Sequence, residues 1–189
     1  MSTAPKSYIT PEEYLALDNQ SELQNEYVDG EIFAMATVSK NHRSIVLNLT
    51  RHLGIKLADS SCRVDGPQCR VFIPARTAYV YPDVLVTCGE EQYLEDSEQT
   101  LLNPILVIEV LSPSTEDYDH GKKFACYRSL PSFREYLLVA QDQVSVEHFY
   151  YQEPGIWTFR EHLQRSDEIG FKSIPAALSL QSIYEKVPV

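Results

Sequence analysis

A single acidic residue interrupts the most apolar segment of the chain. Residues 105–111 read Ile-Leu-Val-Ile-Glu-Val-Leu, and a nearly continuous apolar run of this length is typical of a strand covered on both faces of a sheet. An unpaired, ionised carboxylate at Glu109 would cost several kcal/mol in such a place. The sequence therefore predicts that a cation, a metal ion or a hydrogen-bond donor lies against Glu109.

A second acid stands at the start of another apolar strand, expected over residues 81–87. Asp83 follows Pro82 there, and two neighbouring strands would place Asp83 and Glu109 within reach of one divalent cation. Mg²⁺ prefers one or two carboxylates and keeps several waters. We therefore expect Mg²⁺ or Mn²⁺ at Asp83, Glu109 and a backbone carbonyl near Val110. Asp after Pro is also a common strand-entry residue, so the dipeptide alone is a weak signal.

The cation nearest to Glu109 along the chain comes from the helix expected after it, over residues 118–129. Asp119, Lys123 and Tyr127 are spaced four apart and share one helix face, whereas Lys122 is turned further away. A strand, a tight loop and a returning helix would bring Lys123 over Glu109. A lysine there can orient a water and stabilise negative charge at phosphorus. The same residues could instead form a purely structural ion pair.

Other elements follow from turn signals and apolar periodicity. Thr10 and Pro11 predict a short helix that ends near Leu17, and Asp29-Gly30 predicts a hairpin between residues 26–28 and 31–35. Ser39 or Asn41 begins a long helix, whose apolar residues recur every four positions: Ile45, Leu49, Leu53 and Leu57.

The second half of the chain has mainly β character. Strands are expected over residues 70–73, 136–139, 144–151 and 157–159, with a surface loop over 90–99 and a short closing helix from residue 174. The pattern predicts one α/β domain over residues 1–189, with a mixed central β-sheet flanked by helices and an N-terminal hairpin.

The composition and net charge of the chain argue against some classes of function. The 189 residues are 43% hydrophobic, enough for a sizeable core, and carry 16 Lys and Arg against 27 Asp and Glu, a formal charge of −11. This balance argues against a protein that holds nucleic acid on a broad basic face. Any DNA chemistry would need a local positive cleft or a metal ion, and we expect weak, salt-sensitive binding.

The four cysteines are expected to be reduced. Cys62, Cys69, Cys88 and Cys126 form no C-x-x-C pair, and scattered thiols in a chain of this length are more often free than a disulfide framework. No N-terminal apolar region or run of about 20 apolar residues indicates a signal peptide or a membrane span. A cytoplasmic location is the expectation.

The motifs around these acids resemble those of the Uma-two family, small bacterial proteins of the PD-(D/E)xK nuclease superfamily. The resemblance covers most of the chain, including His42, and its segments are residues 26–32, 81–83, 109–115, 119–127 and 135–139. The segment Glu-Val-Leu-Ser-Pro-Ser-Thr with its following Asp and Lys is the specific part.

The resemblance implies a restriction-endonuclease-like fold with a metal-dependent phosphodiesterase site. Asp83 and Glu109 match the family's metal-binding acids. The superfamily motif places a lysine two residues after the Glu, but here that position is Leu111. In this family the lysine lies on the following helix, where Lys123 matches it. Glu31, slightly favoured over Glu26, would supply a further acid. Further candidates for positioning or substrate contact are His42, Asp119 and Tyr127.

The expected substrate is DNA, but the acidic charge keeps a second interpretation open. Basic residues that could form a groove are Arg43, Arg51, Lys56, Lys122 and Arg128, although each could equally belong to a solvated face. The alternative is a nuclease fold kept as an interaction or regulatory module, in which Asp83, Glu109 and Lys123 form only a buried ion-pair network. The aromatic residues 149–151 weakly suggest a homodimer.

Overall fold

The architecture is built on a mixed six-stranded sheet. A computed structural model describes residues 8–21, 23–35, 38–95, 97 and 99–189, and its larger sheet has the strand order β11-β10-β9-β8-β6-β3. Only β8 and β9 pair in parallel; the other neighbours are antiparallel. The strands are β3 (Cys62–Asp65), β6 (Val84–Cys88), β8 (Leu106–Val110), β9 (Glu135–Val139), β10 (Val146–Glu153) and β11 (Ile156–His162). The predicted mixed sheet is confirmed.

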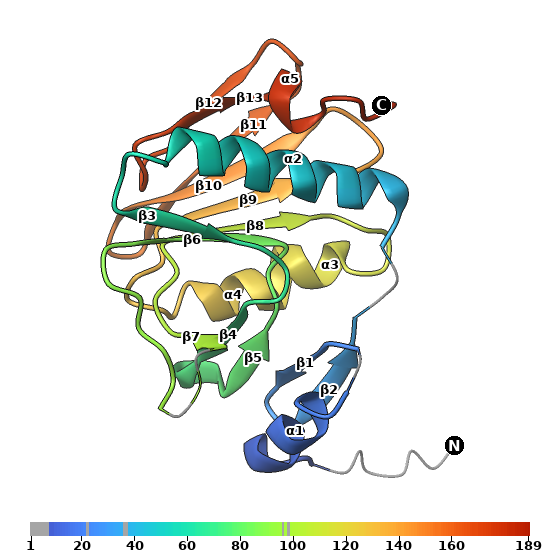
Figure 1. Cartoon of the computed structure of the whole chain (residues 1–189), viewed down its shortest axis with the longest axis vertical. Helices are drawn as coiled ribbons and strands as arrows, with labels where there is room; N and C mark the ends of the chain where they lie inside the picture. The colour runs from blue at the N-terminus through green and yellow to red at the C-terminus, as the bar shows by residue number, and fades with distance from the viewer. Residues whose placement is uncertain (1–7, 22, 36–37, 96, 98) are drawn as a thin grey trace.

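The helix α2 (Lys40–Lys56) covers one face of this sheet (Figure 1). Its stripe of Ile45, Leu49 and Leu53 is fully buried, because a residue every four positions returns to the same side of a helix. These residues pack with the apolar side chains on one face of β6, β8 and β9. The same cluster includes residues of the C-terminal elements β12 (Glu168–Gly170), β13 (Ala177–Ser179) and α5 (Leu180–Ile183).

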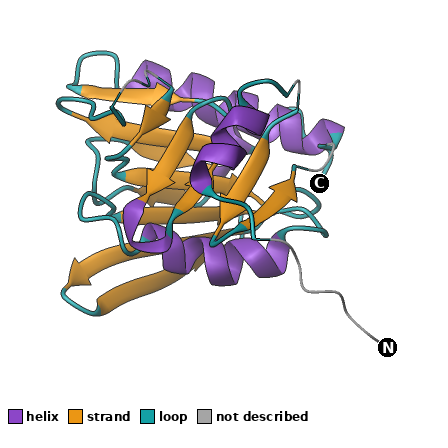
Figure 2. Ribbon diagram, turned by 90° about the horizontal axis from the view of Figure 1, so that it is seen from below, coloured by secondary structure: helices purple, strands orange, loops and turns teal. Residues whose placement is uncertain are grey.

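The other face of the sheet packs against a helical segment and a second sheet. The segment consists of α3 (Glu116–Tyr118), a π-helical turn (Asp119–Lys123) and α4 (Phe124–Tyr127). The smaller sheet has the order β2-β1-β5-β4-β7, and its strands are β1 (Asn25–Val28), β2 (Glu31–Ala34), β4 (Arg70–Ile73), β5 (Ala78–Val80) and β7 (Thr100–Leu101). Seen from below, one helix lies in front of the strands and further helices lie at the upper and lower edges of the molecule (Figure 2).

The N-terminal elements form as their local signals predict. Thr10 caps α1 (Pro11–Asp18) in a capping box with Glu13. The hairpin of β1 and β2 turns at Asp29 and Gly30, whose φ angles of 55° and 92° are the positive values that a tight hairpin turn requires.

Three expectations need correction. Residues 81–83 are not part of a strand, because β5 ends at Val80 and β6 begins at Val84, and the three residues connect one sheet to the other. The helix expected over residues 118–129 runs from Glu116 to Tyr127 and contains a π-helical turn. Towards the C-terminus, helix forms only at α5, because residues 177–179 pair with β12.

The prediction that all four cysteines are free is wrong. Cys62 on β3 and Cys88 on β6 occupy directly paired positions and form a disulfide, with their Cα atoms 3.9 Å apart. The two cysteines are 26 positions apart, so the pairing has no local signal in the sequence, and only the register of the two strands brings them together. Cys69 and Cys126 are free thiols. None of the helices within the described residues is both long and apolar enough to cross a bilayer.

Candidate active site

Asp83 and Glu109 lie side by side because β6 and β8 are neighbours. Val84 pairs with Ile108, so the same antiparallel register continued by one residue sets Asp83 opposite Glu109. The backbone N–H of Asp83 donates to Oε2 of Glu109 at 3.3 Å, and the N–H of Val110 donates to Oδ2 of Asp83 at 2.7 Å. Both residues are buried.

The cation expected beside Glu109 is Lys123. Its Nζ atom lies 2.9 Å from Oε1 of Glu109 and 2.9 Å from Oε1 of Glu26, and 3.8 Å from Oδ1 of Asp119. The Lys123 side chain is 5% exposed, so its charge is compensated by these acids rather than by water. Lys122, the next residue back, points away and is exposed.

Two tyrosines join this network from opposite sides. The Tyr127 hydroxyl donates to Oε1 of Glu109 at 3.1 Å, one helical turn beyond Lys123. The backbone N–H of Tyr81 donates to Oε1 of Glu26 at 3.0 Å. We call Glu26, Asp83, Glu109, Asp119 and Lys123 the acid–lysine cluster.

Glu26, rather than the slightly favoured Glu31, is the acid of the first hairpin that enters this cluster. Both lie on paired strands of the hairpin, but Glu26 reaches Lys123 from β1, which is sandwiched between β2 and β5. Glu31, on the edge strand β2, lines a different cavity. The pairing of β1 with β5 is a long-range contact, and the sequence carries no local signal for it.

His42 reaches the site from the first turn of α2. Its Nε2 atom donates to Oδ1 of Asp83 at 2.9 Å, and its backbone N–H donates to the capping side chain of Ser39 at 3.1 Å. Its Nδ1 atom is buried and has no hydrogen-bond partner among the described residues. The N-cap of α2 thus fixes the histidine that holds Asp83.

The cluster contains more negative than positive charge. Burial raises the pKa of Glu109 well above its ordinary value; Asp119, Asp83 and Glu26 raise it further, against the opposing effect of Lys123. Burial also raises the pKa of Asp119. For Lys123, burial favours the neutral amine, but Glu109 and Glu26 outweigh it and raise the pKa well above its ordinary value, so the lysine stays protonated. Additional positive charge would therefore be favourable here.

The cluster lines a cavity of about 600 Å³. Phe33 and Tyr118 form part of its wall, with ring centroids 5.7 Å apart in a stacked arrangement. Residues of the α2 N-terminus and of the loop after β8 complete it: Val38, Ser39, His42, Ser112, Pro113, Ser114 and Thr115. The buried acids are therefore reachable by a ligand.

The donor set of this cavity fits a hard divalent cation. Carboxylate oxygens are the ligands that Mg²⁺ prefers, and it is commonly held by one or two of them with waters completing the shell. Asp83 and Glu109 supply two, beside Val110, whose carbonyl is the predicted backbone ligand. Among the described residues, no three His, Cys, Asp or Glu side chains are grouped to hold a metal ion by themselves. Water would therefore have to complete the coordination.

The residues expected to contact nucleic acid lie outside this cavity. Arg43 is exposed on α2 and donates to the carbonyl of Val38, and Arg128 stacks over the ring of Phe124 at 4.8 Å. Lys122 lines the neighbouring cavity instead. Among the described residues that line the first cavity, the basic ones are His42 and Lys123. The charge of Lys123 is already paired with Glu26 and Glu109.

Comparison with known proteins gives one family. Residues 11–182 match the Uma2 family, described as "Putative restriction endonuclease". Two uncharacterized proteins of Synechocystis sp. (strain ATCC 27184 / PCC 6803 / Kazusa) are similar: slr1290 is 36% identical over 96% of this chain and 94% of its own, and sll1609 is 33% identical over 90% and 97%.

A solved structure shares the fold. It is the crystal structure of a protein described as a "putative nuclease belonging to DUF820" from Anabaena variabilis ATCC 29413, with a TM-score of 0.75 over 93% of this chain and 97% of that one, at 18% identity. The expected nuclease fold is thereby confirmed. The family match spans nearly the whole chain and includes every residue of the acid–lysine cluster, and the chain belongs to the Uma2 family of restriction-endonuclease-like proteins.

Proposed function

We propose that this protein is a metal-dependent endonuclease that hydrolyses phosphodiester bonds of DNA. The observation that carries the proposal is the position of Asp83, directly before β6, opposite Glu109 on the neighbouring β8, beside a buried lysine and within one cavity. Membership in a family described as "Putative restriction endonuclease" supports it. Two acids can hold a metal ion that activates water, and a lysine can stabilise negative charge that develops at phosphorus.

In this proposal Asp83, Glu109 and the Val110 carbonyl hold Mg²⁺ or Mn²⁺. When bound, the ion supplies a more acidic water and neutralises charge that develops on the phosphate. Lys123 orients the attacking water and stabilises the same negative charge. Tyr127 and Glu26 keep the Lys123–Glu109 pair in place, and His42 orients Asp83 through its hydrogen bond.

The second candidate is an interaction or regulatory module on the same fold. It is favoured by the fact that Lys123 already contacts Glu109 and Glu26, and that Asp83 and Glu109 already accept hydrogen bonds from the protein. A network satisfied in this way needs no metal to be stable. The formal charge of −11 also opposes tight binding of a duplex.

Metal-dependent stabilisation and cleavage together separate the two candidates. The melting temperature is measured with and without Mn²⁺ for the wild type, Asp83→Asn and Glu109→Gln, and cleavage of single-stranded and duplex DNA is followed in the same buffers. Asp142→Asn removes an exposed acid outside the cluster and serves as the matched control.

The nuclease proposal expects Mn²⁺ to raise the melting temperature of the wild type and the control by several degrees, since a ligand of the native state stabilises it. The shift disappears in Asp83→Asn, and cleavage falls more than about a thousandfold. A wild type that neither gains stability nor cleaves would favour the interaction module.

A further inference from the structure

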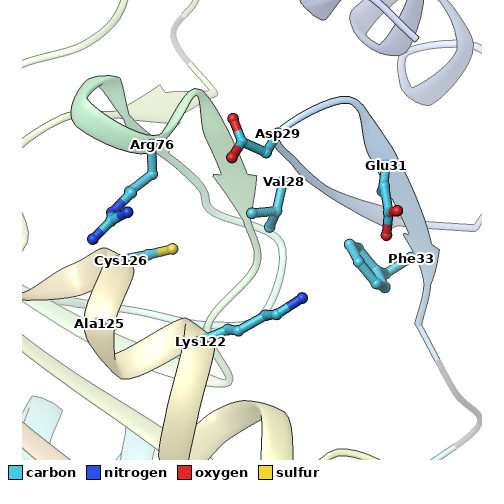
Figure 3. A pocket seen from close by; sticks show the side chains of 8 residues that line it. All are labelled: Val28, Asp29, Glu31, Phe33, Arg76, Lys122, Ala125 and Cys126. Atoms are coloured by element: carbon cyan, nitrogen blue, oxygen red, sulfur yellow. The ribbon is translucent and has the colours of Figure 1, made fainter. Parts of the chain in front are cut away.

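A second cavity lies beside the first, on the side of the hairpin of β1 and β2. It encloses about 350 Å³, and two cations face it from different segments (Figure 3). Arg76 comes from the 3₁₀ turn before β5, and Lys122 comes from the π-helical turn that also carries Lys123. Figure 3 shows the amino group of Lys122 pointing into the open space.

Neither cation is neutralised within the described part of the chain. Each of the other eight arginines there donates to an oxygen, pairs with a carboxylate or stacks on an aromatic ring. Arg76 does none of these, and Lys122 has no carboxylate within ion-pair distance in that part of the chain. Asp29 and Glu31 line the same cavity, but no described carboxylate lies within ion-pair distance of either cation. In a protein with 27 acidic residues, two such cations on one cavity indicate a place for an anion.

An aromatic ring joins this cavity to the acid–lysine cluster. Phe33 lines both cavities, is only half-buried and stacks on Tyr118, which belongs to the wall of the first. Lys122 and Lys123 are adjacent in sequence and face the two cavities separately. A chain of phosphates that passes Phe33 would therefore meet the paired lysine on one side and the unpaired cations on the other.

We propose that the second cavity binds a phosphate of a single DNA strand whose neighbouring phosphodiester lies at Asp83 and Glu109, with a base stacked against Phe33. The proposal rests on the proposed function. Cations that follow the backbone together with an aromatic ring that stacks a base are the usual means of holding a single strand. Asp29 lines the hairpin side of the same cavity, and its negative charge would oppose the second strand of a duplex.

Binding measured in EDTA tests the cavity separately from hydrolysis. The probe is a fluorescein-labelled single DNA strand of about 12 nucleotides, titrated with protein over a range of salt concentrations and followed by anisotropy. Arg76→Gln/Lys122→Gln removes both cations, and Phe33→Leu removes the ring. Arg160→Gln/Lys186→Gln removes two positive charges elsewhere on the exposed surface and is the matched control.

We expect the Arg76/Lys122 double variant to bind about tenfold more weakly than the wild type and the control, with a salt slope smaller by about 0.7 because one phosphate contact is lost. Phe33→Leu weakens binding of the single strand, and the duplex of the same sequence binds more weakly than the single strand. Binding unchanged from the control, no binding by the wild type, or tighter binding of the duplex would each overturn the proposal.

The failure of this proposal is distinguishable from failure of the nuclease function. If Asp83→Asn abolishes cleavage while the Arg76/Lys122 variant binds DNA like the control, the nuclease proposal at Asp83 and Glu109 is supported and only the proposed phosphate site in the second cavity is wrong. If no variant and no metal supports cleavage, the EDTA titration still decides whether a single strand is held by Arg76, Lys122 and Phe33.

Discussion

The Nζ atom of Lys123 lies 2.9 Å from Oε1 of Glu109, although the two residues belong to different elements. The position two residues after Glu109 is Leu111, whose side chain packs in the apolar cluster between the sheet and the helical segment. The amine therefore reaches the acid from the π-helical turn and not from the strand. π-Helical turns are often found at functional sites, and here the turn carries both Asp119 and Lys123.

Lys123→Met should destabilise the protein strongly. The substitution leaves Glu109 and Glu26 buried without their cation, a loss that typically costs about 3–5 kcal/mol. Urea unfolding at neutral pH measures the change. Adding Glu26→Gln to this variant should recover part of the lost stability, because one of the uncompensated charges is removed. A single variant as stable as the wild type would show that the ion pair contributes little.

His42→Gln should weaken Mn²⁺ binding while leaving the fold intact. The variant alters the hydrogen bond to Oδ1 of Asp83, and loss of a group that orients a metal ligand typically costs about 10–100-fold in affinity. Calorimetric titration with Mn²⁺ gives the affinity. His52→Gln makes the same change near the far end of α2, beside Glu185, and should bind Mn²⁺ like the wild type. Equal affinities for both variants would remove His42 from the site.

Glu135 should make stability depend on pH. Burial alone would raise its pKa, but hydrogen bonds from His148, from Ser173 and from the Lys172 N–H lower it below its ordinary value. Because the folded-state pKa is lowered, this stabilisation is present above the unfolded-state pKa and is lost as the pH falls through the folded-state value. Glu135→Gln should therefore cost about 3 kcal/mol at neutral pH and much less at a pH well below the unfolded-state pKa of about 4.3.

Urea unfolding of Glu135→Gln and of the wild type at both pH values checks this difference. Glu153→Gln, at an exposed position near the end of β10, is the control and should follow the wild type at each pH. A constant difference between Glu135→Gln and the wild type would assign the effect to packing instead of charge.

Reduction of the Cys62–Cys88 disulfide should lower stability by about 3 kcal/mol, since it opens a loop in the unfolded chain whose ends are 26 positions apart. The wild type and Cys62→Ser/Cys88→Ser are unfolded with and without a reductant. Reductant should destabilise only the wild type, down to the level of the double variant. Cys69→Ser leaves the disulfide intact and should still respond to reductant. An insensitive wild type would contradict the cross-link between β3 and β6.

Local patterns predicted the parts of the site that lie within single elements. Glu109 stands out because its neighbours are all aliphatic. The spacing of Asp119, Lys123 and Tyr127 predicted that they share one helix face. In the structure Lys123 contacts Asp119, and both Lys123 and Tyr127 contact Glu109. The buried stripe of α2 and the Asp29-Gly30 turn were equally readable, because helix periodicity and turn chemistry act over a few residues.

Features that depend on how distant strands pair could not be predicted from the sequence. The choice of Glu26 over Glu31 follows from the pairing of β1 with β5, and the disulfide follows from the register of β3 with β6. Neither pairing has a signal in the residues that make it. The π-helical turn also escaped prediction, since the same residues fit an ordinary helix. The second cavity combines side chains from three separate segments.

The three residues between β5 and β6 cross from the smaller sheet to the larger one, and Asp83 is the last of them. Tyr81, the first, is tied through its hydroxyl to Asp18, which also binds Arg70 on β4. The acid–lysine cluster, which takes Glu26 from β1 of the smaller sheet, is therefore completed only once both sheets have docked. A molecule whose N-terminal strands have detached would keep a folded larger sheet but lose Glu26 from the acid–lysine cluster, so partial unfolding would disrupt the proposed site before the whole protein unfolds.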